Sequence, residues 1–232
     1  MVEPPRDAND ALAPRWHTAL LVALILGYAV AGAVARGWGG PSHPDPLPLG
    51  SSRIAGLYAP MIAALWLQCA YVVRSPRHLP RLLGPRWATA RGLGADVAIA
   101  LLFAGAVEAL EIALASSGQG AAGTALAAIV PVTVAERVVW VAVALSAGFC
   151  EEVVYRGYLQ AQLGAFTRSP RAGVVLQGAL FGLAHGEQGW AIAARFAVYG
   201  AAFGAVARWR HTLRSGVIAH AGIDLVGGLL GR

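Results

Sequence analysis

Seven apolar stretches separated by polar turns constrain the fold of this chain more than any other feature. They cover residues 18–35, 54–73, 95–115, 133–163, 172–185, 189–207 and 216–230. About 20 predominantly apolar residues form a helix that crosses the hydrocarbon core of a bilayer. Because lipid offers no hydrogen-bond partners, a spanning segment must pair its own backbone groups, as a helix does. The sequence therefore predicts an all-α, polytopic transmembrane helical bundle with about seven membrane segments.

The composition agrees with a membrane protein. Hydrophobic residues make up 57% of the chain and charged residues 13%, whereas soluble domains carry about 25% charged residues. The 18 basic residues are all arginines, and with 12 acidic residues they give a net charge of +6. In a membrane protein such a balance reflects orientation and contact with the lipid bilayer, so we expect no nucleic-acid partner. Cys69 and Cys150 show neither zinc-ligand spacing nor a disulfide pattern.

The chain divides into three parts on this reading. Residues 1–17 are polar and proline-rich and are predicted to form a disordered cytoplasmic tail, residues 18–132 form N-terminal transmembrane helices, and residues 133–232 form the core helices. The first apolar run ends in "AVAR" at Ala35, a pattern that a signal peptidase accepts. A cleaved signal peptide and a retained signal anchor are both compatible with it. We favour the anchor, because the run reaches the ~18 residues expected of a span.

The arginines predict the orientation. With a cytoplasmic N-terminus, twelve of them fall on the inner side: Arg6, Arg15, Arg74, Arg77, Arg81, Arg86, Arg91, Arg168, Arg171, Arg208, Arg210 and Arg214. The outer side keeps Arg36, Arg53, Arg137 and Arg232. By the positive-inside rule we expect a multi-pass protein of the cell inner (plasma) membrane, with the N-terminus in the cytoplasm. The segment 172–185 is short for a span and is predicted to open into a cavity.

Ionisable residues inside membrane spans are rare and are functional candidates. The stretch "GFCEEVVYRGYLQ" contains Glu151, Glu152 and Arg156. On a helix, Glu152 and Arg156 share a face and can pair, whereas Glu151 points about 100° away, on the face of Tyr155. One carboxylate is thereby neutralised and the other stays free to act as a base. The structural alternative is a Glu–Arg pair that only fixes helix packing.

Two further motifs bring imidazoles into the membrane. In "LFGLAHGEQGW" His185 follows Phe181 by four residues, so that the ring of Phe181 can shield and orient the imidazole. In "RSGVIAHAGID" His220 and Asp224 also lie four residues apart, an arrangement typical of an orienting pair. Taken singly, each histidine is equally compatible with a hydrogen-bonded core residue. Together the three motifs supply what the hydrolysis of an amide bond requires.

The motifs "EEVVYR", "FGLAH" and "HAGID", in this order, resemble those of the CPBP family of intramembrane proteases. That family includes the CAAX prenyl endopeptidases and bacterial proteins linked to bacteriocin processing and self-immunity. The resemblance covers about residues 133–230 and implies a CAAX-protease-like core. It also implies that Glu151 and His185 activate water, that Glu152 with Arg156 shapes the site, and that His220 and Asp224 stabilise the oxyanion.

One family position is altered here and leaves two questions open. Asp224 stands where several members have Asn, and an ionised Asp cannot donate a hydrogen bond to an oxyanion. It would then orient His220, stay protonated or help to bind a metal. Glu151, His185, His220 and Asp224 are candidate zinc ligands, but no H-E-x-x-H motif is present. We favour water activation that requires no cofactor, with zinc as the alternative.

The sequence therefore predicts an intramembrane endopeptidase that hydrolyses a membrane-anchored peptide or protein. A catalytically inactive scaffold or self-immunity protein of the same fold is the alternative. A proton-coupled transporter built on Glu108, Glu111 and Arg195 is disfavoured, because the matched broken helices of transporters are missing from the sequence. Those three residues are expected to line the cavity or to pair within the bundle.

Overall fold

The computed structural model describes residues 11–35, 50–73, 78–85, 87–116, 129–186 and 189–230. Within these ranges the secondary structure is helical and contains no strand. The elements, in chain order, are α1 (Arg15–Ala35), α2 (Ser51–Arg53), η1 (Ile54–Tyr58), α3 (Ala59–Val72), α4 (His78–Leu83), α5 (Ala90–Ser116), α6 (Val134–Glu151), η3 (Glu152–Leu159), α7 (Gln160–Thr167), α8 (Pro170–Ala184), α9 (Trp190–Arg210) and α10 (Arg214–Leu230). The elements η1 and η3 are π-helical.

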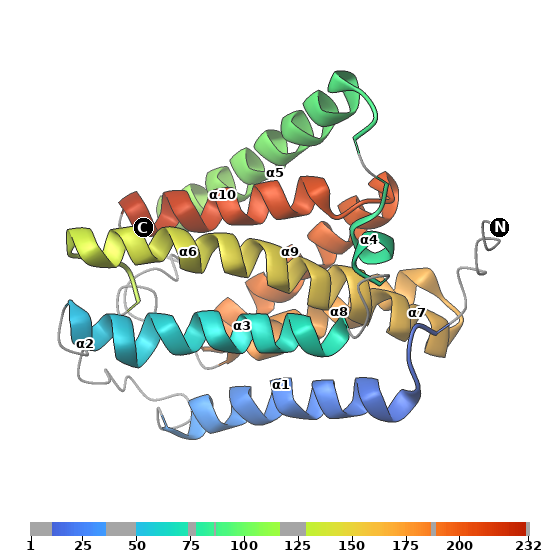
Figure 1. The fold of residues 1–232 in the computed structure, drawn as a ribbon, viewed down its shortest axis with the longest axis horizontal. Coiled ribbons are helices and arrows are strands. Elements are labelled where there is room, and N and C mark those ends of the chain that lie inside the picture. Colours follow the sequence, from blue (N-terminus) through green and yellow to red (C-terminus); the bar gives the residue numbers. More distant parts are fainter. Residues whose placement is uncertain are drawn as a thin grey trace.

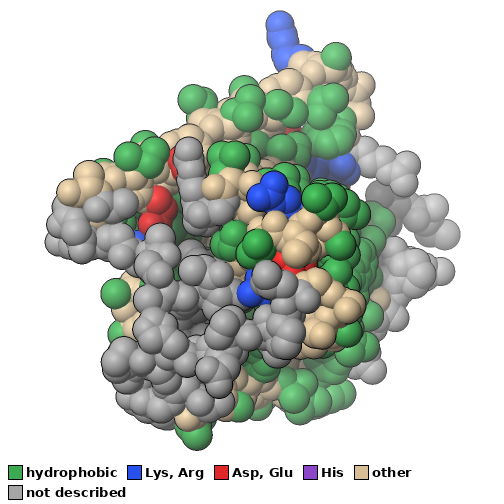
Figure 2. All heavy atoms as spheres, turned by 90° about the vertical axis from the view of Figure 1, so that its left-hand side faces the viewer, with side chains coloured by type: hydrophobic (Ala, Val, Ile, Leu, Met, Phe, Trp, Pro, Cys, Tyr) green, Lys and Arg blue, Asp and Glu red, His purple; other side chains and the backbone are tan. Residues whose placement is uncertain are grey.

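The long helices form a bundle of nearly parallel and antiparallel rods, with α5 inclined to the others (Figure 1). Among the described residues, five helical segments are long and apolar enough to span a membrane: Arg15–Gly32, Ser51–Val72, Ala90–Leu114, Val134–Thr167 and Trp190–Arg210. Hydrophobic side chains dominate the flanks of the bundle, and only a few charged side chains appear on the end seen in Figure 2. The chain is therefore an all-α, multi-pass membrane protein.

The two remaining predicted segments correspond to shorter helices. The helix α8 has 15 residues and α10 has 17 residues, compared with the ~20 residues of a full span. Both pack inside the bundle, because Phe181 of α8 and His220 of α10 are almost fully buried. The helix that contains the adjacent glutamates is by contrast longer than predicted, since α6, η3 and α7 run without a break over residues 134–167.

The arginines gather at one end of the bundle. The start of α1, the helix α4, the end of α7 and the turn from α9 to α10 all lie to the right in Figure 1. Arginines of the described ranges in these segments are Arg15, Arg81, Arg168, Arg171, Arg208, Arg210 and Arg214. The alternating direction of the helices thus brings distant arginines to one end, which we call the arginine-rich end.

Two segments near this end contact the bundle. The polar turn after the second apolar stretch contains the short helix α4, whose Leu82 packs beside Gly157 of η3. In the segment predicted to be a tail, the amides of Leu12 and Ala13 donate hydrogen bonds to Gln162 of α7. Residues 1–10 of that tail, and the proposed cleavage point after Ala35, lie outside the described residues or at their edge.

Glycines allow α6 and η3 to lie directly against α10. A Cβ atom on Gly148 of α6 would come within 2.6 Å of the backbone nitrogen of Ala221. A Cβ atom on Gly216 of α10 would lie 2.6 Å from the Oε2 atom of Glu152. Small residues at such crossings let two helix backbones approach closely inside a membrane. This close approach brings the glutamates of one helix to the histidine of the other.

Two polar clusters attach α5 to α9 and α10. Asp96 accepts hydrogen bonds from Arg210 of α9 at 2.9 Å and from Ser215 of α10 at 2.7 Å. Nearer the other end of α5, Glu111 accepts a hydrogen bond from Arg195 of α9 at 3.0 Å. The predicted pairing of Arg195 within the bundle is therefore confirmed. These contacts hold a helix whose remaining surface faces mostly outward.

We expect Gly148→Ala to lower the melting temperature of the purified protein, because the added methyl group meets the backbone of Ala221 rather than a side chain that can rotate. Overpacking of this kind costs about 1–3 kcal/mol. The matched control is Gly94→Ala on α5, where a Cβ atom meets nothing within 4 Å. Equal melting temperatures for the two variants would show that the α6–α10 contact does not need Gly148.

Candidate active site

A π-helical segment forms the centre of the site. Glu151 is the last α-helical residue of α6, and the next eight residues, Glu152–Leu159, form η3. Inserted π-helical turns are rare and occur often at functional sites. All eight residues of η3 are buried, including the charged Glu152 and Arg156. The sequence contains no recognised signal for this segment, and a regular α-helix was expected.

Glu152 and Arg156 form a buried ion pair. The Nη1 atom of Arg156 lies 3.1 Å from the Oε1 atom of Glu152, and both side chains have no exposed surface. The guanidinium carbon of Arg156 lies 4.2 Å from the ring centre of Phe181 and 5.1 Å from that of Phe203. Aromatic faces attract a cation, and the attraction is stronger where water is excluded. The predicted pairing of Glu152 with Arg156 is therefore present, and two aromatic rings support it.

His220 lies between both glutamates of the motif. Its Nδ1 atom is 3.2 Å from the Oε1 atom of Glu152, and its Nε2 atom is 3.5 Å from the Oε2 atom of Glu151. The two carboxylates therefore converge on one imidazole, whereas we expected Glu151 to point to a different part of the bundle. Because a carboxylate accepts, His220 donates from Nδ1 to Glu152, which fixes the orientation of the ring.

Asp224 completes this group. Its Oδ2 atom lies 3.7 Å from the Nε2 atom of His220, a distance of an ion pair rather than of a hydrogen bond. The hydrogen bond that orients the ring of His220 is therefore made by Glu152 and not by Asp224. We refer to Glu151, Glu152, His220 and Asp224 as the carboxylate–imidazole cluster. With three carboxylates around one ring, a proton on Nε2 of His220 or on a neighbouring carboxyl group relieves their repulsion.

The cluster has an open and a closed side. The side chains of Glu151 and Asp224 retain 18% and 30% of their exposure, whereas that of Glu152 has none. On this side, Glu151 and Asp224 are therefore part of the surface, and the ion pair lies behind them. The open carboxylates are the groups suited to chemistry, and the closed pair is suited to support.

His185 lies beside the cluster, at the end of α8. Its Nδ1 atom is 2.8 Å from the backbone oxygen of Phe181, and its ring stacks on that of Phe196 at 4.3 Å between centres. A carbonyl oxygen only accepts hydrogen bonds, so Nδ1 carries the proton and Nε2 of the neutral ring is an acceptor. The predicted neighbour Phe181 does contact it, at 4.8 Å between ring centres.

Glu151 lies beside His220 and does not contact His185 directly. In the described part of the chain, no ion pair joins His185 to Glu151, and the imidazole within 4 Å of Glu151 is that of His220. Phe181 bridges the two histidines, because its ring centre lies 4.8 Å from that of His185 and 6.1 Å from that of His220. The two imidazoles thus face one aromatic residue from different helices.

Sequence reasoning missed three aromatic residues of the site: Phe196, Phe203 and Trp140. Phe203 lies 5.5 Å from His220 between ring centres, on the side of the buried pair. Trp140 donates a hydrogen bond of 2.8 Å to the backbone oxygen of Asp224, and Gly228 lies against its indole ring. The signal available in the sequence was weak, since an aromatic residue in an apolar helix is ordinary in any bundle.

The candidate zinc ligands do not form a metal site in this arrangement. Across the residues that the structure describes, no group of three or more His, Cys, Asp or Glu side chains is placed to hold one ion. We therefore derive no step that passes through a metal.

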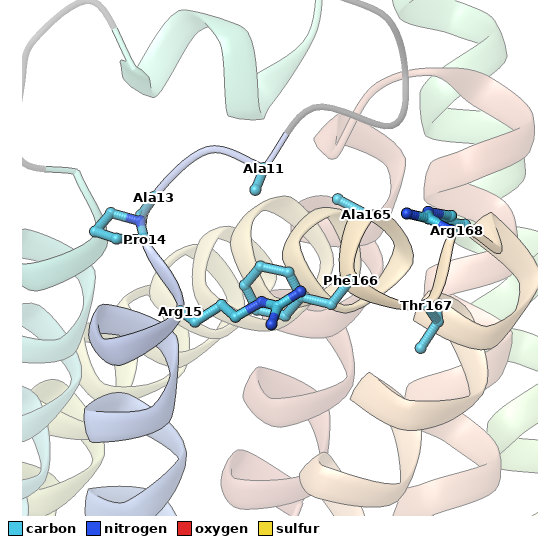
Figure 3. A pocket seen from close by; sticks show the side chains of 8 residues that line it. All are labelled: Ala11, Ala13, Pro14, Arg15, Ala165, Phe166, Thr167 and Arg168. Carbon is cyan, nitrogen blue, oxygen red and sulfur yellow. The ribbon is translucent and has the colours of Figure 1, made fainter.

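A cavity lies at the arginine-rich end of the bundle, away from the carboxylate–imidazole cluster. It has a volume of about 460 Å³ and is formed by the segment before α1 and the end of α7 (Figure 3). Its lining residues are Ala11, Ala13, Pro14, Arg15, Ala165, Phe166, Thr167 and Arg168. None of them belongs to the carboxylate–imidazole cluster, so this cavity at the arginine-rich end is separate from the candidate active site.

The fold and the site define a multi-pass, all-α membrane protein that holds two histidines and several carboxylates inside its bundle. Residues 133–226 match the family model of type II CAAX prenyl endopeptidases, described as Rce1-like. This match supports the CPBP/CAAX protease family that the three motifs predicted, and with it a CAAX-type intramembrane protease fold. Neither the curated proteins nor the solved structures contain a match to the chain.

The buried ion pair makes a testable contribution to stability. Removing one partner of such a pair costs about 3–5 kcal/mol, because the other charge stays buried and unpaired. We expect Arg156→Met to unfold at a much lower temperature than the unmodified protein, and the double variant Glu152→Gln with Arg156→Met to recover part of the loss. Thermal unfolding of the unmodified protein, the single variants Glu152→Gln and Arg156→Met, and the double variant in one detergent measures the coupling. Additive losses would contradict a direct interaction between the two side chains.

Proposed function

We propose that the chain is an intramembrane endopeptidase that uses Glu151 to activate water. The observation that supports this most directly is the position of Glu151. Its carboxylate is partly exposed and faces the Nε2 atom of His220, while the adjacent Glu152 is held by Arg156 and fixes the same ring. Two neighbouring carboxylates in different environments are the arrangement that separates a reactive group from a supporting one.

In the proposed reaction, Glu151 removes a proton from a water molecule while the water oxygen bonds to the carbonyl carbon of the scissile peptide. The tetrahedral oxyanion then collapses and the C–N bond breaks. The proton taken up by Glu151 passes to the leaving nitrogen, so the products are a carboxylic acid and an amine. His185 assists, because its Nε2 atom is available to accept a hydrogen bond from the attacking water.

His220 is proposed to stabilise the oxyanion. Its ring is oriented through Nδ1 by Glu152, and a proton on Nε2 provides the donor that an oxyanion needs. Asp224 lies near the same nitrogen and favours that proton electrostatically, so an acidic residue is compatible with this position. The substrate is proposed to be a membrane-associated peptide or protein, and the reaction as written needs no cofactor.

We expect Glu151→Gln to lose cleavage of the membrane-associated substrate while the protein remains folded. The amide preserves the shape of the side chain but cannot take a proton, and general acid–base catalysis contributes about 10²–10⁴-fold to a rate. Substrates are found by comparing new peptide termini in membranes with and without the active protein. The control is Glu108→Gln, a glutamate of α5 outside the carboxylate–imidazole cluster. Retained cleavage in Glu151→Gln would refute the proposed base.

The same assay tests the cofactor proposal. Activity is expected to persist after treatment with a strong chelator. Loss of activity that added zinc restores would contradict the reaction as written and would favour the four candidate ligands named from the sequence.

For the location, we propose the cell inner (plasma) membrane with the arginine-rich end in the cytoplasm. A cysteine at Thr167, the last residue of α7, should then be protected from a membrane-impermeant thiol reagent until cells are opened. A cysteine at Ser51, where α2 begins at the other end of the bundle, should react in intact cells. The opposite labelling pattern would reverse the orientation.

A further inference from the structure

Several buried polar atoms on the closed side of the carboxylate–imidazole cluster have no hydrogen-bond partner in the described part of the chain. They are the Oε2 atom of Glu152, the Nε and Nη2 atoms of Arg156, the Oε1 atom of Gln160 and the Oε1 atom of Gln177. More than about 90% of buried polar groups in proteins have a partner, and an exception requires an explanation such as an ordered water. Here the exceptions are concentrated in one region.

The region opens at the arginine-rich end. A cavity of about 140 Å³ is lined by Arg156, Gln160, Ala161, Gly164, Pro170 and Arg208. Arg208 is exposed at the end of α9, whereas Arg156 is only 3% exposed. The cavity therefore leads from a surface arginine to a fully buried one. Its volume exceeds what a single water molecule occupies, which is ~30 Å³ in the liquid.

Glycines let the polar side chains of this region come close together. The amides of Gln160 and Gln177 both lie against Gly204, where a Cβ atom would collide with each of them. Farther in, the unpaired Oε2 atom of Glu152 lies against Gly216, where a Cβ atom would come within 2.6 Å of it. We call the series Arg208, Gln160, Gln177, Arg156 and Glu152 the polar track. It begins at the arginine-rich end and stops at the carboxylate that orients His220.

The chemistry of the unpaired atoms identifies the ligand. Arg156 offers N–H donors, whereas Gln160, Gln177 and Glu152 offer acceptor oxygens. An anion such as phosphate would satisfy the arginine but would be repelled by the acceptors, and a cation would be repelled by Arg156 and Arg208. Water both donates and accepts. We propose that the polar track is a water-binding channel that hydrates the buried Glu152–Arg156 pair from the arginine-rich end.

This channel is distinct from the open side of the cluster. Glu151 and Asp224 are exposed in their own right, whereas the channel reaches Glu152, whose side chain is closed to the surface. The water in it lowers the cost of keeping Arg156 charged inside a bilayer, because it supplies partners that the protein does not. The inference concerns hydration alone and stands whether or not the chain is a protease.

The test observes the arginine directly in the full chain. Protein labelled with ¹⁵N-arginine is placed in lipid nanodiscs, and magnetisation transfer from water to the Nε–H group of Arg156 is measured by NMR. The peak is assigned from its loss in Arg156→Lys, or from its shift in Phe203→Leu, since Phe203 lies over the guanidinium. A cross-peak with water is expected. A resolved Arg156 peak without water contact would overturn the proposal.

A matched pair of variants locates the water. The double variant Gln160→Leu with Gln177→Leu removes two acceptors of the channel and should abolish the water cross-peak of Arg156. The control is Gln162→Leu. Gln162 lies on α7, as Gln160 does, but its amide donates hydrogen bonds to Ala13 and Thr18, which lie outside the channel. It should leave the cross-peak unchanged. Displacement of the water signal by added inorganic phosphate would also overturn the proposal, in favour of an anion site.

Discussion

The ion pair between Glu152 and Arg156 is the interaction on which the rest of the site depends. A charged pair without exposed surface is stabilised only by good geometry and by further partners. Arg156 finds those partners in the rings of Phe181 and Phe203, and Glu152 finds one in His220. Through these contacts one helical turn is attached to α8, α9 and α10 together. The pair therefore determines where three helices meet.

Close helix approach then converts this support into a site. Gly148 and Gly216 remove the side chains that would separate α6 and η3 from α10, so His220 reaches both glutamates. In a membrane such packing replaces the hydrophobic driving force that water supplies to soluble proteins. The result is an asymmetric cluster, in which Glu151 stays accessible and Glu152 is closed. That asymmetry distinguishes the proposed base from the residue that positions the imidazole.

The sequence was sufficient to predict the fold class, the order of the helices and the pairing of Glu152 with Arg156. These depend on hydrophobic periodicity and on residues four apart, which are local properties. The π-helical form of η3 and the pairing of Glu151 with His220 depend on contacts between helices far apart in the chain. Trp140 and Phe203 were missed for the same reason, because their roles come from the backbone and rings that they face.

The surroundings of the ion pair reflect the cost of burying polar groups inside the bundle. Burying a polar group without a partner costs about 1–3 kcal/mol even in proteins. The bundle meets this cost in two ways: aromatic rings and a carboxylate surround one side of Arg156, and the polar track lies on the other. A fully dry bundle would leave Nε and Nη2 of Arg156 unpaired. A fully open one would separate Arg156 from Glu152 and release His220, and the proposed channel, which ends at the ion pair, avoids both outcomes.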